Sequence, residues 1–295
     1  AISSSGPSAS TDVNVSSSRC PVPIASATLV ARRISSTLFV IVRGVTPFAS
    51  FHAVCFSRRR FISPIGYFTV DTTQNFFNTI PYTFQWGEPF THTGVWTQYQ
   101  VNDRLAISAA VVRGWDNFDN SNSWPGVIAT CSYTFSDQSN LSYYGIHSRE
   151  PNAVARFTPR YFHSIVWQKP INDAWKYVAQ ADFGTQQQSL ANGRAAQWYG
   201  LNQYLFYQIN DRITFGGEFE WWRDEEGYRC AGFLPGDAPS GITSHARGFP
   251  VNRFGYAGNF YQVTLGPKWF PTDSLNVYVR PNFRVDWYQG DVLNP

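Results

Sequence analysis

Two glutamates, Glu218 and Glu220, are the side chains in this sequence best placed for acid–base chemistry. They lie two positions apart in a stretch that alternates polar and apolar residues, so on a β-strand both would point to the same face. Neighbouring carboxylates on one face can approach the separation of roughly 5–5.5 Å that a retaining glycosidase requires. No other catalytic group accompanies them, so the sequence favours a protein that is not an enzyme, with a hydrolase as the less favoured alternative.

A second set of charged side chains lies near the C-terminal end. Arg280, Arg284 and Asp286 occupy even positions of one alternating stretch, whereas Val279 and Val285 occupy odd positions. On a strand the charged residues would therefore share one face and the valines the other.

Metal and cofactor sites are not indicated. His92 follows Glu88 by four positions, but no second histidine or cysteine stands at the spacing of a zinc site. Asp116 and Asp119 lie in an oxygen-rich stretch that lacks the spacing and the glycine of an EF-hand loop. We therefore expect neither a bound metal ion nor a cofactor.

The elements that must position these side chains are β-strands. Residues 95–101 alternate apolar and polar side chains, and residues 105–112 do so again after the turn Asn102-Asp103-Arg104. Asn and Asp tolerate the positive φ angles of tight hairpin turns, and strict alternation indicates strands and not helices. Four further pairs of stretches follow this pattern: 127–135 with 141–147, 160–168 with 175–183, 198–209 with 213–222, and 260–270 with 275–286. Together they predict roughly 10–12 antiparallel strands.

The connections between these strands alternate in length. Those within the pairs are short, whereas those between the pairs are long and rich in Gly, Asn, Pro and Asp: 114–126, 148–159, 184–197 and 223–259. Short turns at one end and long loops at the other are typical of transmembrane β-barrels, and a soluble β-sandwich has no reason to sort its loops in this way. The longest loop, 223–259, is the one that we expect to fold into the barrel.

The composition suits a sheet with one wet face and one apolar face. Aromatic residues make up 17% of the chain and charged residues 15%, and the mean hydropathy is −0.28. The sequence has no apolar run long enough for a transmembrane helix. Aromatic residues gather near the predicted strand ends, where they would form the interfacial belts of a membrane barrel. The interfacial aromatic residues that we predict are Tyr99, Tyr207, Trp221 and Trp269.

These observations predict an all-β, antiparallel transmembrane β-barrel with a polar interior. Charged side chains on the inner faces of its strands would line an aqueous pore and set its ion selectivity. Acidic residues on one wall and arginines on another would create an electric field across that pore. The residues predicted to line the pore are Glu218, Glu220, Arg280, Arg284, Asp286, Lys268 and Arg113.

The N-terminal part of the chain does not share this pattern. Residues 1–60 are rich in serine and hold seven arginines and one acidic residue, whereas the remainder holds 16 basic and 19 acidic residues. We expect residues 1–61 to be a disordered or artefactual leader and residues 62–295 to be the barrel. The mildly acidic barrel has no clustered basic face of the kind that binds nucleic acid. The chain stops at Pro295 without a terminal aromatic residue, so we expect a C-terminally truncated, incomplete barrel.

Several motifs resemble one family of bacterial outer-membrane proteins. They are 85–94 (QWGEPFTHTG), 113–118 (RGWDNF), the NDR turns at 102–104 and 210–212, and 215–224 (FGGEFEWWRD). They resemble the second family of β-barrel porins of Gram-negative bacteria, over residues 62–286 of this chain. The resemblance implies an outer-membrane barrel with a pore and supplies no catalytic residues.

The predicted function is passive diffusion of small hydrophilic solutes or ions across the outer membrane. The expected partners are outer-membrane lipids, lipopolysaccharide and small polar solutes, but not nucleic acid, and a homotrimer is the assembly that porin-like barrels often form. The alternative is a carbohydrate-binding surface β protein whose aromatic residues stack on sugars. That alternative does not explain the sorted loops or the apolar strand faces.

Overall fold

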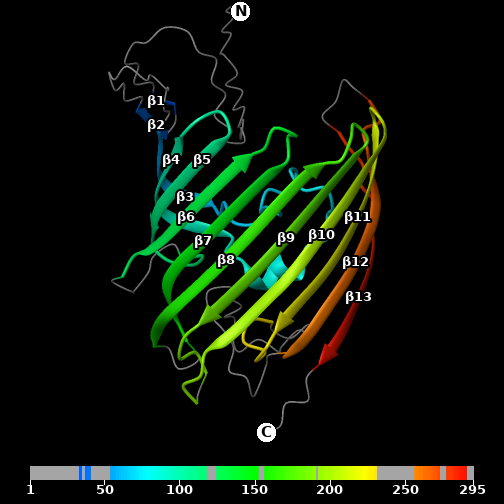
Figure 1. Ribbon diagram of the computed structural model, residues 1–295. Coiled ribbons are helices and arrows are strands. Elements are labelled where there is room, and N and C mark those ends of the chain that lie inside the picture. The colour runs from blue at the N-terminus through cyan, green and yellow to red at the C-terminus, as the bar shows by residue number, and fades with distance from the viewer. Residues whose placement is uncertain are drawn as a thin grey trace, which may run out of the picture.

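The protein forms one long antiparallel sheet, in which each strand pairs with its neighbours in sequence order from β1 to β13 (Figure 1). The computed structural model describes residues 33–34, 37–40, 54–117, 124–152, 156–190, 192–230, 256–272 and 277–290. The strands are β1 (Arg33–Ile34), β2 (Thr37–Val40), β3 (Val54–Ile62), β4 (Thr91–Gln100), β5 (Leu105–Val112), β6 (Gly126–Thr134), β7 (Asn140–Pro151), β8 (Phe157–Pro170), β9 (Trp175–Gln186), β10 (Ala196–Asn210), β11 (Ile213–Asp224), β12 (Gly258–Trp269) and β13 (Phe283–Gly290).

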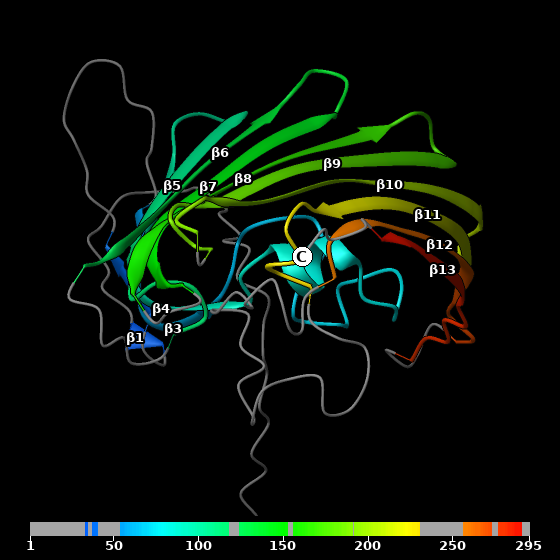
Figure 2. The ribbon, with the colours of Figure 1, turned by 90° about the horizontal axis from the view of Figure 1, so that it is seen from below.

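The sheet is strongly curved. Seen end-on, it forms an open arc, and the segment between β3 and β4 lies on its concave side (Figure 2). Among the described strands, β13 does not pair with β1, so the sheet is not closed. We call residues 63–90 the inner segment; it contains the single-turn π-helix η1 (Thr83–Gly87). Within the described residues, no helix has the length and apolarity needed to cross a membrane.

Side chains alternate between the two faces of the sheet. In β10, Trp198, Asn202 and Tyr204 are buried on the concave face, whereas Leu201 and Leu205 are 43% and 42% exposed on the convex face. The same alternation leaves large apolar side chains exposed along the convex face: Val111, Val127, Leu141, Ile165, Phe183, Phe215, Phe219, Leu265 and Val285. This arrangement is expected of a sheet that separates lipid from a polar interior.

Asparagine side chains build three of the short turns. Asn102, Asn172 and Asn210 each accept hydrogen bonds of 2.9 Å from the backbone N–H groups two and three residues later. Such turns let a strand reverse within a few residues. Most short turns lie at one end of the sheet, and the inner segment and the connections after β5, β9 and β11 leave from the other end. The predicted sorting of the connections is therefore confirmed in part. Residues 152–156, between β7 and β8, form a connection as short as a turn, and residues 270–282, between β12 and β13, form a long connection where a short turn was predicted.

The C-terminal strand differs from the prediction. Alternation predicts a strand over residues 275–286, but β13 occupies Phe283–Gly290. Leu265 of β12 pairs with Phe283 of β13, and an isolated bridge joins Trp269 to Val279. The same register places Pro267 opposite Pro281. Proline has no N–H group to donate to a strand ladder, so regular pairing stops there and β13 starts beyond it.

The sheet also begins earlier than predicted. β3 pairs with β4 along its whole length, although it lies in the segment 1–61 that we expect to be a leader. Three consecutive arginines, residues 58–60, interrupt the apolar alternation of this strand. Apart from β1, β2 and β3, residues 1–61 lie outside the described residues.

Replacing Phe219 with arginine should destabilise the folded protein. Phe219 lies midway along β11 and is 39% exposed on the apolar convex face. An arginine near the bilayer midplane costs about 2–4 kcal/mol in transmembrane barrels. The measurement is the free energy of unfolding by urea in phospholipid vesicles.

The matched control is Gln187→Arg, at an exposed position in the connection after β9. We expect its free energy of unfolding to change by less than about 0.5 kcal/mol. An equal loss in both variants would contradict a lipid-facing convex surface.

Candidate functional site

The inner segment is held on the concave side by side chains of the sheet. Glu220 of β11 accepts hydrogen bonds from the backbone N–H groups of Tyr82 at 2.7 Å and Thr83 at 2.6 Å. These N–H groups belong to the first turn of η1 and have no partner within a helix. The carboxylate of a distant strand therefore caps the helix from across the interior.

Two arginines of the C-terminal hairpin bind the same segment. Arg280 Nη1 donates to the carbonyl of Asn75 at 2.7 Å, and Arg284 Nη1 donates to the carbonyl of Ile80 at 2.6 Å. Arg284 also donates to both carboxylate oxygens of Asp286 at 2.6–2.9 Å. Both arginines thus hold the inner segment through its backbone carbonyls.

A shared amide links the inner segment to β9. Gln180 accepts the N–H group of Tyr67 at 2.8 Å, and its Nε2 donates to Glu88 at 2.5 Å and to Asp182 at 2.7 Å. Glu88 belongs to the inner segment and lies outside the strands. Burial, together with the nearby charge of Asp182, raises the pKa of Glu88 well above its ordinary value of 4.5. Glu88 therefore keeps its proton to higher pH than an exposed glutamate does.

A buried cluster of arginines and tryptophans lies where the long connections leave the sheet. The guanidinium carbons of Arg160 and Arg229 lie 5.0 and 5.3 Å from the ring centroid of Trp115, and 6.0 and 5.1 Å from that of Trp198. Arg229 Nε and Trp198 Nε1 donate to backbone carbonyls of η1 at 2.8 and 3.1 Å. This cluster anchors the C-terminal end of η1, and sequence reasoning did not identify it, because Arg229 lies in a predicted loop far from its partners.

Glu218 and Glu220, predicted to line the pore, both face the concave side and are almost fully buried. Glu218 accepts a hydrogen bond from Asn202 Nδ2 at 3.1 Å. The alternation of β11 accounts for their common face. Their contacts, with a neighbouring strand and with η1, could not be predicted from that alternation.

Lys268 lies beside Arg280, because both contact the ring of Tyr278, whose centroid is 5.1 Å from the Arg280 guanidinium carbon. The Lys268 ammonium is 4.5 Å from the same ring centroid, near the connection between β12 and β13. Arg113 lies apart from the other predicted pore-lining residues. Arg113 follows the last residue of β5, is exposed, and continues the alternation of exposed Val111. The structure therefore does not bring Arg113 to the concave face.

The predicted interfacial aromatic residues all lie on the convex face of the sheet, on the same face as exposed neighbours such as Leu205, Phe219 and Leu265. Tyr207 is 38% exposed and packs against Trp175 with ring centroids 4.5 Å apart, and Trp269 ends β12. Trp221 donates a hydrogen bond to Asn259 at 2.9 Å, and Tyr99 lies one residue before the end of β4. Their depth in a membrane stays a prediction.

Both ring nitrogens of His92 have hydrogen-bonding partners within the protein. It is fully buried, and its two ring nitrogens lie 3.1 Å from the carbonyl of Gly114 and 3.1 Å from the hydroxyl of Ser63. In the part of the chain that the structure describes, no three His, Cys, Asp or Glu side chains are grouped so that they could hold a metal ion.

The inner segment lies on the concave side of the sheet, where the sequence predicted the loop 223–259 to lie. Residues 231–255 of the predicted pore-entering loop, 223–259, lie outside the described residues. Residues 63–90 carry a signal that could have been used, because they interrupt the alternating pattern with prolines and glycines such as Pro64, Gly66 and Pro81.

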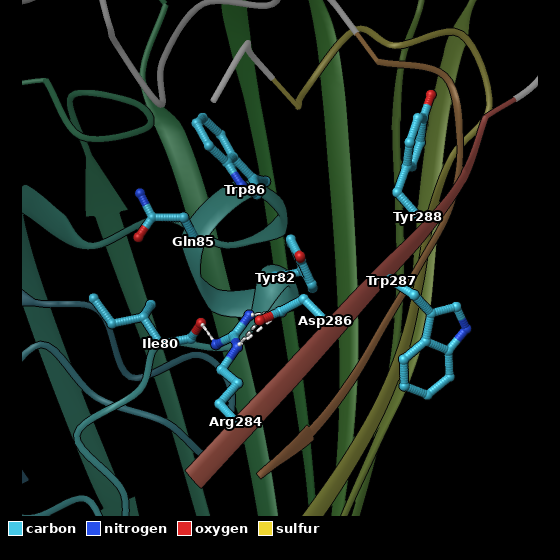
Figure 3. A pocket seen from close by; sticks show the side chains of 8 residues that line it. All are labelled: Ile80, Tyr82, Gln85, Trp86, Arg284, Asp286, Trp287 and Tyr288. Atoms are coloured by element: carbon cyan, nitrogen blue, oxygen red, sulfur yellow. Dashed lines mark hydrogen bonds and ion pairs between the residues drawn. The ribbon is translucent and has the colours of Figure 1, made fainter. Parts of the chain in front are cut away.

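A cavity of about 510 Å³ lies between the inner segment and β13 (Figure 3). Aromatic and hydrogen-bonding side chains line it together, and the guanidinium carbon of Arg284 lies 5.2 Å from the ring centroid of Tyr82. The lining residues are Ile80, Tyr82, Gln85, Trp86, Arg284, Asp286, Trp287 and Tyr288. Such a cavity can accept a polar solute that also has an apolar face.

Comparisons with known proteins agree with this architecture. The family described as "Putative beta-barrel porin-2, OmpL-like" matches residues 60–294. The solved structure of the outer membrane channel DcaP of Acinetobacter baumannii is similar, with a TM-score of 0.51 and 9% sequence identity, over 88% of this chain and 76% of that chain. At this identity the similarity shows the fold alone. No curated protein matches the sequence.

Replacing Glu220 with alanine should loosen the inner segment, because two buried N–H groups lose their acceptor. Hydrogen bonds to charged groups contribute about 1.5–3 kcal/mol each, so we expect the loss of both bonds to lower the free energy of unfolding by about 3–6 kcal/mol. Amide hydrogen exchange in residues 80–90 should accelerate, and mass spectrometry of that peptide measures it.

The control for this variant is Glu225→Ala, just beyond the end of β11, where a partly exposed carboxylate pairs with Arg223. A surface ion pair of this kind contributes at most about 1 kcal/mol. The role assigned to Glu220 is wrong if exchange in residues 80–90 is the same in the two variants.

Replacing Glu88 with glutamine should reduce the pH dependence of stability. The pKa of Glu88 is raised in the folded state, so its contribution to stability is fully present below the ordinary value of 4.5 and is lost as the pH rises through the raised pKa. The urea midpoint of the wild-type protein should therefore fall with rising pH, and that of the variant should fall less steeply. The hydrogen bond from Arg223 lowers the pKa of Glu225 below its ordinary value of 4.5, so above pH 4.5 Glu225→Gln should keep the wild-type slope. Identical slopes in all three proteins above pH 4.5 would exclude Glu88 as the titrating group.

Proposed function

The chain belongs to the putative beta-barrel porin-2, OmpL-like family of outer-membrane porins, and we propose that it provides a route for passive diffusion of small hydrophilic solutes and ions. Membership places the protein in the outer membrane and in a family of channels. The identity of the solutes is the part that we propose.

The observation that carries this proposal is the contrast between the two faces of the sheet. The convex face is apolar, whereas the concave face carries hydroxyl, amide and carboxyl side chains among its apolar ones. The neutral polar side chains buried on the concave face include Ser142, Ser164, Gln180, Asn202, Gln262 and Thr264. A polar interior of this kind supports the passage of hydrophilic molecules.

The inner segment supports a limit on solute size. It fills part of the concave side and is fixed at both ends of η1, by Glu220 and by the arginine–tryptophan cluster. Solutes would therefore pass beside this segment, and the cavity against β13 is an opening of suitable chemistry. Arg284 and Asp286 would lie on that route.

Planar-bilayer recordings of the full chain should show discrete current steps proportional to voltage, and Arg284→Glu should shift the reversal potential toward cation selectivity. The reason is that the substitution places a negative charge beside Asp286 at the proposed route. The matched control is Arg104→Glu in the exposed turn after β4, which should shift the reversal potential much less. Protein that is folded by gel mobility but electrically silent would refute the channel function.

A further inference from the structure

The cavity against β13 combines two features that diffusion alone does not require: fixed aromatic faces and a charge-balanced set of hydrogen-bonding groups. We propose that this cavity is a binding subsite for neutral saccharides of one or two rings. The inference rests on the proposed channel function and names a class of solute that the channel would select.

Aromatic rings from two elements face the cavity. Trp86 comes from η1 on one side and Tyr288 from β13 on the other, with Tyr82 beside the ion pair (Figure 3). The face of an aromatic ring carries partial negative charge, which attracts the weakly positive C–H groups on the face of a pyranose. The rings therefore offer stacking surfaces for a sugar.

Tyr288 is held in place before any ligand arrives. Its ring lies 4.7 Å from that of Phe260, and its hydroxyl donates to the carbonyl of Ala257 at 2.5 Å. The residue is nevertheless 43% exposed. A ring that is both oriented and accessible loses little conformational freedom on binding, which favours affinity.

The polar groups of the cavity favour an uncharged ligand. Arg284 and Asp286 neutralise each other through three hydrogen bonds, so neither an anion nor a cation gains a net opposite charge. The side chain of Asp286 is still 39% exposed and can accept further hydrogen bonds from hydroxyl groups. The Gln85 amide offers both a donor and an acceptor, which matches the mixed hydrogen bonding of sugar hydroxyls.

The volume also fits this class of ligand. The cavity measures about 510 Å³, inside the range of roughly 300–1,000 Å³ that small-molecule sites occupy. It opens onto the proposed solute route, so a bound sugar would obstruct the ion current. Binding can therefore be observed directly in the open channel.

The test is titration of the channel current with maltose, a neutral disaccharide. We expect a saturable, reversible reduction of the current, and Trp86→Ala should weaken the apparent affinity by about tenfold. Trp86→Phe keeps an aromatic face and should recover most of the affinity. Trp124→Ala removes a tryptophan that is 64% exposed and outside the cavity, and it should leave the affinity unchanged.

Several outcomes would overturn the proposal. Open channels that maltose does not block would exclude the subsite and leave the channel function standing. Block by benzoate but not by maltose would assign the cavity to aromatic anions, and equal effects of Trp86→Ala and Trp124→Ala would place any sugar site elsewhere. If no current is seen, the channel function fails, and tryptophan fluorescence of the detergent-solubilised protein titrated with maltose still decides whether the sugar binds.

Discussion

The buried backbone of the inner segment must find hydrogen-bond partners, and this constraint organises the interior of the protein. A loop placed inside a sheet has no strand ladder to satisfy its N–H and C=O groups. Here the wall supplies side chains for that purpose: Glu220 and Gln180 accept from N–H groups, and Arg280, Arg284 and Arg229 donate to carbonyls. Charged residues on the concave face therefore act first as partners of the backbone.

This use of charge is local. Asp286 pairs with Arg284 on the same strand, and Glu220 faces the N-terminal end of η1, where a negative charge is favourable. Glu88 has a carboxylate neighbour instead, and burial and that neighbour raise its pKa. The interior therefore combines a neutralised ion pair, Arg284 and Asp286, with a carboxyl group whose pKa is raised by burial and by a carboxylate neighbour.

Alternation in the sequence was sufficient to predict most of the strands and the faces of Glu218, Glu220 and Arg284, because period two is a property of the local backbone. It failed at two local exceptions. Pro267 lies opposite Pro281, so regular pairing is interrupted there and β13 begins later than predicted. Three consecutive arginines interrupt the apolar alternation of β3, so that strand was not predicted. The inner segment could not be predicted in this way. Its contacts join residues far apart in the chain, such as Tyr82 and Glu220, which are 138 positions apart, and no local pattern encodes such a distance.

That separation also determines the order of assembly. Three hydrogen bonds of the inner segment need partners from much later in the chain. The partner of Tyr67 is Gln180, 113 positions later; that of Tyr82 is Glu220, 138 positions later; and that of Asn75 is Arg280, 205 positions later. Contacts between residues this far apart form slowly, because a long loop must close before they contribute. The inner segment therefore cannot settle until β9 to β13 have been made and have curved around it. Before those strands are in place, the N–H and C=O groups of the inner segment must still form their hydrogen bonds with water.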